Sequence, residues 1–339
     1  MLYCTSLPDP LIALEACDFW LVLTESECQV HMQAHLADIV PVLVRGMVYS
    51  AEDLIDLERE NDNEFESEQD IRPRHHKARN HAAEQHDDSD ENDDEDEEPE
   101  DSWNVRKCCA SAVDVMATVY GDDLLPYILP AINAQLCSTE WQVREAGILA
   151  LGAISDGCMN GMEPHLATII PILTTCLQDQ KALIRSITCW TLSRYACWIV
   201  PTGRHADSSQ QIHLETYFYP ILQGVHLKLT QILALILDKS KQVQKAACSS
   251  LASFEEEAGE LVVPLVGPIV HNLALAFPKY HAKNLLILYD TVAALADAVG
   301  PELGKPEYLD LLMPAVIGKW AATLDFDPAL FSLFEVLKS

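Results

Sequence analysis

Apolar residues recur along this chain at three- and four-residue spacing, in segments of ordinary helix length. Four of these segments open alike, with an apolar residue followed by Arg or Gln and then by small and aliphatic side chains. The apolar anchors of the four segments are Val105, Val143, Ile184 and Val243. A fifth segment, His281–Val299, has the same helical pattern without that opening. The pattern predicts five related amphipathic helices.

A second predicted helix precedes most of the anchored helices and often begins near a proline. The clearest examples are Leu124–Leu136, His165–Leu177 and Val263–Phe277. Successive anchors are 38, 41 and 59 residues apart, and the first two steps lie near the period of about 40–47 residues that HEAT and armadillo units show. The sequence therefore predicts an all-α fold, a HEAT-repeat α-solenoid, in which antiparallel helix pairs stack into a right-handed superhelix.

Two insertions interrupt the repeat and set the expected organisation. Residues 1–48 form a partial repeat and the first helix of the next one, 49–102 form an acidic disordered loop within that repeat, and 103–339 continue the repeats. A further surface insertion is expected near 201–221, and the last repeat is incomplete. Terminal repeats of a solenoid usually carry polar caps. Neither end shows one convincingly, so the sequence is expected to be part of a longer solenoid.

Composition and charge narrow the classes of function. Nearly half of the residues are apolar (49%), which allows a large buried core. The formal net charge is −30, of which residues 51–101 carry −18 and the other residues only −12. Such a surface repels nucleic acid and anionic membranes and attracts basic polypeptides. The apolar stretch Leu261–Phe277 contains prolines and polar residues, so it predicts a buried helix and not a membrane span, in a soluble, intracellular protein without an evident signal peptide.

Residues typical of catalysis or metal binding are not arranged in a known motif. The chain has 11 cysteines without a CxxC pair, and Cys108, Cys158, Cys189 and Cys248 fall in apolar helical patterns, which predicts reduced core thiols. No phosphate-binding glycine loop, zinc-protease motif or nucleophile elbow occurs. Histidines near the acidic tract could hold a transition metal, although such polar clusters are more often solvated; they are His75, His76, His81 and His86. The prediction is a protein that is not an enzyme and needs no cofactor or metal.

Several segments resemble the transportin family of nuclear import receptors, which belongs to the importin-beta superfamily of HEAT-repeat proteins. The similar segments are Ser67–Arg74 with the acidic run after it, Trp103–Cys108, Ala182–Ala196, His281–Asp290 and Lys305–Tyr308. The resemblance covers nearly the whole chain and corresponds to the middle of such a receptor. It implies that the N-terminal repeats, which bind the small GTPase Ran in this family, are missing here, as are the C-terminal ones.

The anchored helices of a solenoid line its concave side, and their positions 3, 6, 10 and 13 after the anchor share one face. On and beside that face lie an aromatic and aliphatic patch and several carboxylates. These candidate residues are Ser111, Asp114, Leu149, Ile187, Trp190, Ser253, Glu256, Asp290 and Asp297. The periodicity predicts only a shared face, and each residue could equally belong to the core or to a solvated surface. The resemblance implies that they bind a cargo signal, a basic residue followed closely by proline-tyrosine.

The acidic run is open to two interpretations. A block of like charge is usually a solvated linker, whereas the resemblance implies a regulatory segment that occupies the cargo site when Ran-GTP binds elsewhere. Its carboxylates are Asp87, Asp88, Asp90, Glu91, Asp93, Asp94, Glu95, Asp96, Glu97 and Glu98. Without the Ran site, this segment is not expected to be triggered.

The resemblance also implies a set of partners and a location. The partners are cargo proteins with basic proline-tyrosine signals, many of them RNA-binding proteins, together with Ran and nuclear pore proteins, and no nucleic acid or membrane directly. The implied location is the cytoplasm and the nucleus, between which the receptors shuttle. Two alternatives remain open: a HEAT scaffold of a multiprotein complex, and an acidic chaperone for basic proteins.

Overall fold

The computed structural model contains α-helices, 3₁₀ helices and turns, and no strand among the residues it describes. These residues are 1–7, 9–26, 29–55, 57, 104–200, 229–280, 282–323, 330 and 333–334. The acidic run, the histidines beside it, Trp103 and the insertion near 201–221 lie outside them. The chain divides into two compact units, one formed by Met1–Ser50 with Arg74–Gly161 and the other by Ala51–Pro73 with Met162–Ser339.

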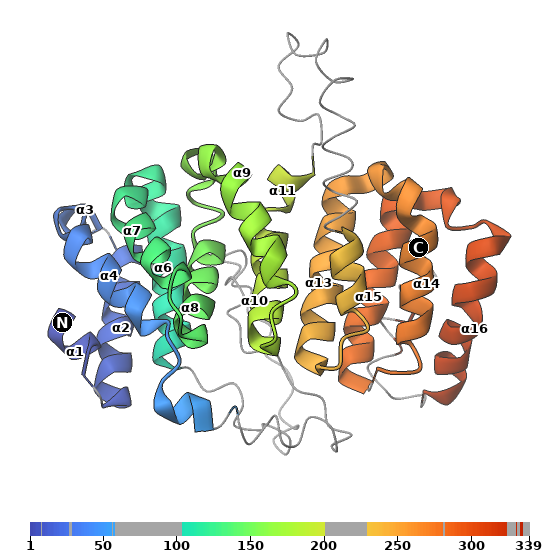
Figure 1. The fold of residues 1–339 in the computed structure, drawn as a ribbon, viewed down its shortest axis with the longest axis horizontal. Coiled ribbons are helices and arrows are strands. Elements are labelled where there is room, and N and C mark those ends of the chain that lie inside the picture. Colours follow the sequence, from blue (N-terminus) through green and yellow to red (C-terminus); the bar gives the residue numbers. More distant parts are fainter. Residues whose placement is uncertain are drawn as a thin grey trace, which may run out of the picture. The chain divides into compact units, whose positions relative to one another are not determined.

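The first unit is built from helices that pack in pairs (Figure 1). Its elements are α1 (Leu2–Thr5), α2 (Pro10–Glu25), α3 (Gln29–Met32), η1 (Gln33–His35), α4 (Leu36–Gly46), α6 (Val105–Tyr120), η3 (Gly121–Leu124), α7 (Leu125–Leu136) and α8 (Trp141–Ala153). Helix α6 contacts α2, α4 and α8, while α7 contacts α4 and α8. The helices that carry the sequence anchors, α6 and α8, are therefore neighbours, as the repeat predicts.

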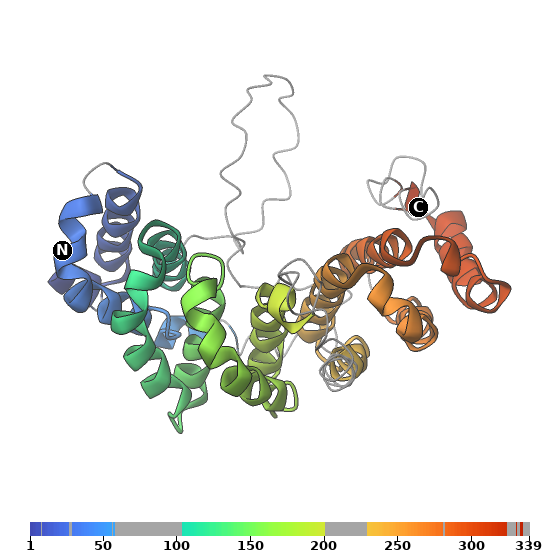
Figure 2. The ribbon, with the colours of Figure 1, turned by 90° about the horizontal axis from the view of Figure 1, so that it is seen from above.

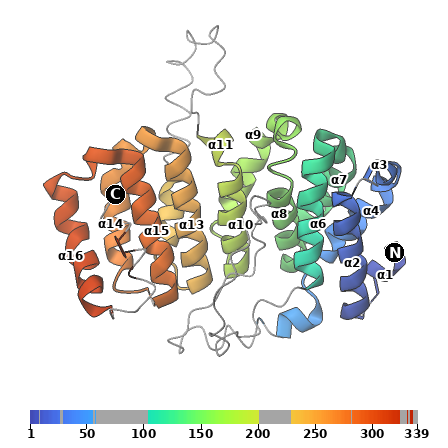
Figure 3. The same cartoon turned by 180° about the vertical axis from the view of Figure 1, so that it is seen from behind.

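The second unit continues the same alternation. Its elements are α9 (Met159–Cys176), which begins just ahead of Met162, α10 (Ala182–Arg194), α11 (Ala196–Ile199), a helical segment at 229–235, α13 (Lys241–Ala258), η5 (Gly259–Leu265), α14 (Val266–Ala276), α15 (Ala282–Val299), η6 (Gly300–Glu302) and α16 (Pro306–Ala322). Helices α10, α13 and α15 form a row in which α13 contacts both neighbours (Figure 3). From above, α14 is set apart from this row (Figure 2) and contacts α15 and α16.

Polar residues and glycines mark where these helices begin and end. Asp9 precedes α2 and its Oδ1 accepts a hydrogen bond from the Leu11 backbone N–H at 3.1 Å, and Asn104 caps α6 by accepting from Lys107 N–H at 2.9 Å. Such caps satisfy backbone donors that have no partner within the helix. At the other end, Gly121 and Gly259 follow α6 and α13 with φ of 55° and 51°, a conformation that glycine adopts without steric cost.

The core is apolar and includes the cysteines expected there. Cys108, Cys158, Cys189 and Cys248 are each fully buried, which confirms their prediction as core residues. One stretch, Lys241–Ala276, is long and apolar enough to cross a membrane by composition alone. In the structure, this stretch is divided into α13, η5 and α14, and its apolar residues contribute to the helical core.

The structure corrects three expected boundaries. The helix expected at Val263–Phe277 is a 3₁₀ segment up to Leu265 and an α-helix only from Val266. The helix expected from His165 begins at Met159 and contains Pro164. The φ that the proline ring imposes is compatible with a helix, although one backbone hydrogen bond is lost there. The turn expected at 157–161 consequently ends before Met159.

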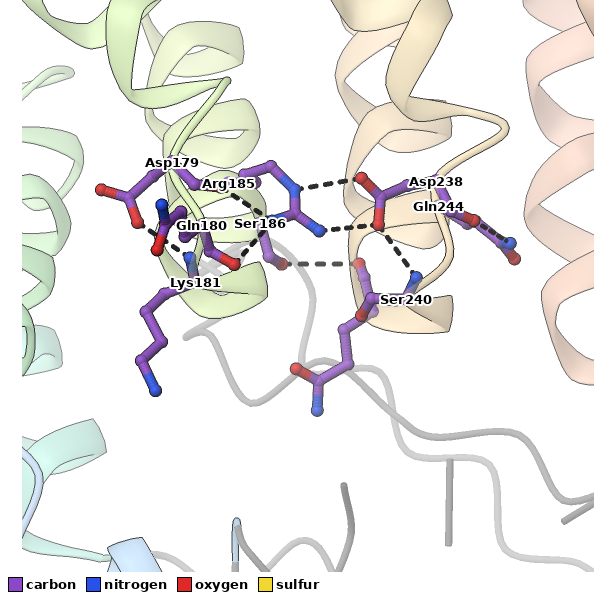
Figure 4. Close-up of polar contacts among 9 residues, drawn as sticks. Asp179, Gln180, Lys181, Arg185, Ser186, Asp238, Ser240 and Gln244 are labelled. Atoms are coloured by element: carbon purple, nitrogen blue, oxygen red, sulfur yellow. Dashed lines mark hydrogen bonds and ion pairs between the residues drawn. The ribbon is translucent and has the colours of Figure 1, made fainter. Parts of the chain in front are cut away.

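A charged contact joins α10 to the turn before α13 (Figure 4). Arg185 donates from Nε and Nη2 to the two carboxylate oxygens of Asp238, at 3.0 and 2.8 Å. Its third nitrogen donates to the backbone carbonyls of Asp179 and Gln180. Asp238 also accepts a hydrogen bond from the Ser240 backbone N–H at 2.9 Å. The arginine that follows the anchor Ile184 in the repeat pattern therefore fixes two interhelical turns at once.

Candidate functional site

Helices α10, α13 and α15 run parallel, and side-chain hydrogen bonds set their register. Thr291 of α15 donates to the Cys248 carbonyl of α13 at 3.2 Å, and Asn284 donates to the Lys241 carbonyl at 3.5 Å. Both pairs are 43 residues apart in sequence. Because the separation is the same at both points, equivalent positions of the two helices lie side by side along their length.

The contact between α10 and α13 is of the same kind. Ser250 of α13 donates to the Cys189 carbonyl at 3.0 Å, and Ser186 of α10 donates to the Gln242 carbonyl at 3.4 Å. Small hydroxyl side chains let helices approach closely while their hydroxyl groups find a backbone acceptor.

The predicted binding residues of this unit differ in exposure. Trp190 and Ser253 are half-buried, and Glu256, Asp290 and Asp297 are exposed. Ile187, by contrast, is only 2% exposed. The accessible residues therefore combine one indole with three carboxylates on three adjacent, parallel helices.

The predicted residues of the first unit lie deeper. Ser111 of α6 and Leu149 of α8 are 5% and 2% exposed, so they offer little surface to a ligand in this structure. Asp114 of α6 is half-buried, and its backbone carbonyl accepts a hydrogen bond from the Thr118 hydroxyl at 3.2 Å. Helix α8 is buried at every position from Glu145 to Ala153, which explains why a side chain such as Leu149 on this helix contributes to packing.

Trp190 already has a cationic neighbour on its own helix. The guanidinium carbon of Arg194 lies 5.8 Å from the centre of a Trp190 ring, within the range of a cation–π contact. Residues four apart share one face of a helix, so the spacing of these two residues in the sequence was a usable signal for this contact. A ligand side chain that stacks on the indole would share it with, or displace, Arg194.

The carboxylates of the row differ in their electrostatic surroundings. Partial burial raises the pKa of the Asp290 carboxyl. Glu255, next to the exposed Glu256, is completely buried and neither of its carboxylate oxygens has a hydrogen-bond partner. Burial, and secondarily the charge of Glu256, raise the pKa of Glu255 well above its usual value. Glu256 is therefore the carboxylate of this pair that can meet a ligand.

A buried charged cluster holds the first unit together beside its part of the candidate site. Arg106 forms an ion pair with Glu145 at 2.6 Å and donates to the Met47 carbonyl, and its guanidinium carbon lies 4.0 Å from the centre of the Tyr49 ring. Desolvation raises the pKa of Glu145, while the charge of Arg106 acts in the opposite direction. The cluster joins the C-terminal end of α4 to the first turn of α6 and to α8.

No group of three or more His, Cys, Asp or Glu side chains is placed to hold a metal ion within the part of the chain that the structure describes. The accessible residues offer an aromatic surface for stacking and carboxylates that can accept charge-assisted hydrogen bonds from basic side chains.

Comparisons with known proteins agree with the repeat architecture. A model of the HEAT-like repeat matches residues 141–195. Transportin-1 of Mus musculus is 49% identical over 350 residues, which cover 100% of this chain and 37% of that protein. Importin subunit beta-2 of Schizosaccharomyces pombe is 43% identical over 363 residues, covering 100% of this chain and 38% of its own length.

Among solved structures, the karyopherin Kap121p bound to the extreme C-terminus of the protein phosphatase Cdc14p has a TM-score of 0.67 at 18% identity, over 99% of this chain and 28% of that one. At this identity the likeness concerns the fold, a HEAT solenoid. The chain spans less than two-fifths of the length of the curated relatives it matches.

Proposed function

We propose that this chain, which belongs to the transportin (importin beta-2) family, is the cargo-binding part of a nuclear import receptor. The observation that carries the proposal is the identity of 49% along the whole chain to a transportin. The family's receptors carry proteins between the cytoplasm and the nucleus, and the same two locations are proposed for this chain. A protein of this kind works by binding and release, and no catalytic step is assigned to it.

The proposed cargo signal is an extended basic segment followed by proline-tyrosine. Trp190 supplies a flat apolar surface on which a proline ring or a guanidinium can stack. Glu256, Asp290 and Asp297 are exposed on the neighbouring helices, and their carboxylates can accept hydrogen bonds from Arg or Lys of the signal. Cargo proteins of this type would be basic, which suits the net charge of −30.

The acidic run and Ran enter the proposal as a regulatory part. The acidic run at 87–98 would occupy the cargo site, and so weaken cargo binding, when Ran-GTP binds elsewhere in a complete receptor. In this chain alone, Ran-GTP is expected to leave cargo binding unchanged. Cargo release that depends on Ran-GTP would contradict this point without affecting the proposed cargo site.

The experiment is a fluorescence anisotropy titration of a labelled basic peptide that ends in proline-tyrosine, against the full chain and against Trp190→Ala combined with Asp290→Ala. The matched control is Trp198→Ala combined with Asp310→Ala, which removes a second half-buried tryptophan and an exposed aspartate of the same unit. The expected result is at least a tenfold loss of affinity in the first variant, corresponding to about 1.4 kcal/mol, and little change in the control.

Two other outcomes separate the alternatives. Binding that survives the first variant but disappears in moderate salt would assign the affinity to the acidic run, as in an acidic chaperone. No preference for the proline-tyrosine peptide over a scrambled peptide of equal charge would favour a general HEAT scaffold. Either result would overturn the proposed cargo site.

A further inference from the structure

Three cysteines meet where α2 packs against α6 in the first unit. Cys17 Sγ and Cys109 Sγ are 3.3 Å apart, and Cys108 Sγ donates to Asp18 Oδ1 at 3.0 Å. All three cysteines are fully buried, while Asp18 beside them is half-exposed. The proposed import function uses none of these groups.

Each thiol carries one proton, and this limits which hydrogen bonds the three cysteines can form. Cys108 Sγ donates to Asp18 Oδ1, and a thiol can donate only one hydrogen bond. A carboxylate is a stronger acceptor than a sulfur, so the Cys108 proton belongs to Asp18. This leaves Cys109 as the donor to Cys17.

The hydrogen bonds also make the sulfurs unequal. The hydrogen bond from the Cys109 thiol lowers the pKa of the Cys17 thiol. The same contact, and then burial, raise the pKa of Cys109, while burial and the hydrogen bond to Asp18 raise the pKa of Cys108. Cys17 is therefore the sulfur that ionises first, and the thiolate is the form that attacks a disulfide.

Helix α4 leaves room for the pair at a glycine. A Cβ at Gly46 would lie 2.5 Å from Cys109 Sγ and 3.6 Å from its Cβ, so any side chain there would displace the sulfur. The two sulfurs must approach by only about 1.3 Å more to reach the length of a disulfide bond, roughly 2.05 Å. Rotation about the Cα–Cβ bonds of two side chains can supply a movement of this size.

We propose that Cys17 and Cys109 are a redox modification site that forms a reversible disulfide with a low-molecular-weight disulfide as the oxidant. The Cys17 thiolate attacks one sulfur of the small disulfide and releases one small thiolate. Cys109, on losing its proton, attacks Cys17 Sγ in the mixed disulfide and releases the second. The two protein thiols are oxidised to one disulfide, the small disulfide is reduced to two thiols, and a small thiol in excess reverses both steps.

The bond would join α2 to α6 across 92 positions of sequence. A crosslink between such distant residues stabilises a fold chiefly by restricting its unfolded state. Because both sulfurs are buried, the exchange requires local opening of the α2–α6 contact. Oxidation at this site is accordingly slower than at the exposed Cys137 and Cys197, and it makes the first unit harder to open.

The test is to incubate the full chain with glutathione disulfide, block remaining thiols, and map the disulfides by mass spectrometry without reduction. The expected result is a peptide pair joined through Cys17 and Cys109, whose formation raises the midpoint of thermal unfolding by about 5 °C or more and is reversed by reduced glutathione. Circular dichroism establishes that the oxidised chain is folded.

Two variants of neighbouring residues provide the matched comparison. Cys108→Ser keeps a donor for Asp18 and should form the crosslink and show the thermal shift, whereas Cys109→Ser should show neither. A crosslink through Cys108 in place of Cys109, or only mixed disulfides with glutathione on the folded wild-type chain, would overturn the proposal. This result is independent of peptide binding, so it can fail while the cargo-binding proposal stands.

Discussion

The guanidinium of Arg185 holds both carboxylate oxygens of Asp238, at 3.0 and 2.8 Å, and so ties α10 to the turn that leads into α13. The side chains of the pair are 15% and 12% exposed. A paired geometry of this kind depends on the planar fork of arginine, and lysine cannot reproduce it.

Arg185→Lys is therefore expected to destabilise the chain by about 1–2 kcal/mol, because one of the two hydrogen bonds to Asp238 and those to the 179 and 180 carbonyls are lost. Chemical denaturation with and without the substitution measures the difference. The reverse change at an exposed neighbour, Lys239→Arg, serves as the control and should be nearly neutral. Equal stability of Arg185→Lys and the wild type would show that the contact contributes nothing net.

Arg106 and Glu145 should respond more strongly, because their side chains are only 5% and 2% exposed. Arg106→Met leaves the Glu145 carboxylate buried without its cation, a loss of about 3–5 kcal/mol. Adding Glu145→Gln removes that charge and should recover part of the loss, as a double-mutant cycle by denaturant unfolding would measure. Lys107→Met at the next, half-buried position is the matched control. Additive effects of the two substitutions would mean that the pair is not coupled.

Much of the fold could be predicted from the sequence because the same spacing of apolar residues recurs in each repeat. The anchors Val105, Val143, Ile184 and Val243 all lie in the first turns of the helices expected there. The boundaries that were wrong, at Met159 and Val266, lie near prolines, where the choice between a turn, a 3₁₀ segment and an α-helix depends on packing against other helices.

The sequence predicts which residues of the candidate site share one side of the helices, but it does not predict which of them are exposed. Helical spacing places Leu149 and Ile187 on the same side as Trp190, but the packing of neighbouring helices decides that only the indole is accessible. The contact between Trp190 and Arg194 could have been found from their four-residue spacing. The meeting of Cys17 with Cys109 could not, because 92 positions separate them.

Gly157 is a position where the close approach of two segments excludes a side chain. A Cβ at this residue would lie 2.1 Å from the carbonyl carbon and oxygen of Ala117 in α6, and backbone cannot yield as a flexible side chain would. Gly157→Ala should therefore cost about 1–3 kcal/mol of stability, as overpacking forces the α8–α9 turn away from α6. Gly318→Ala is the control, because nothing lies within 4 Å of the added Cβ in α16 and alanine favours a helix by about 0.5–1 kcal/mol. Thermal unfolding should move in opposite directions for the two variants, and a neutral Gly157→Ala would mean that the turn moves freely.

Glu255 makes the stability of the chain depend on pH in a direction opposite to that of an ordinary paired carboxylate. Its carboxyl is completely buried without a hydrogen-bond partner, and burial raises its pKa in the folded state well above 4.5. Between the unfolded and the folded pKa the folded state binds more protons, so the contribution of Glu255 to the free energy of unfolding falls as pH rises through that range.

Each pH unit within the range corresponds to about 1.4 kcal/mol. Glu255→Gln, which stays neutral, is therefore expected to stabilise the chain near pH 7 and to match the wild type below about pH 4.5. Denaturant unfolding across this range measures the difference, with Glu256→Gln at the exposed neighbour as the control. A gain from Glu255→Gln that is the same at pH 4 and pH 7 would mean that the carboxyl does not change its protonation on folding.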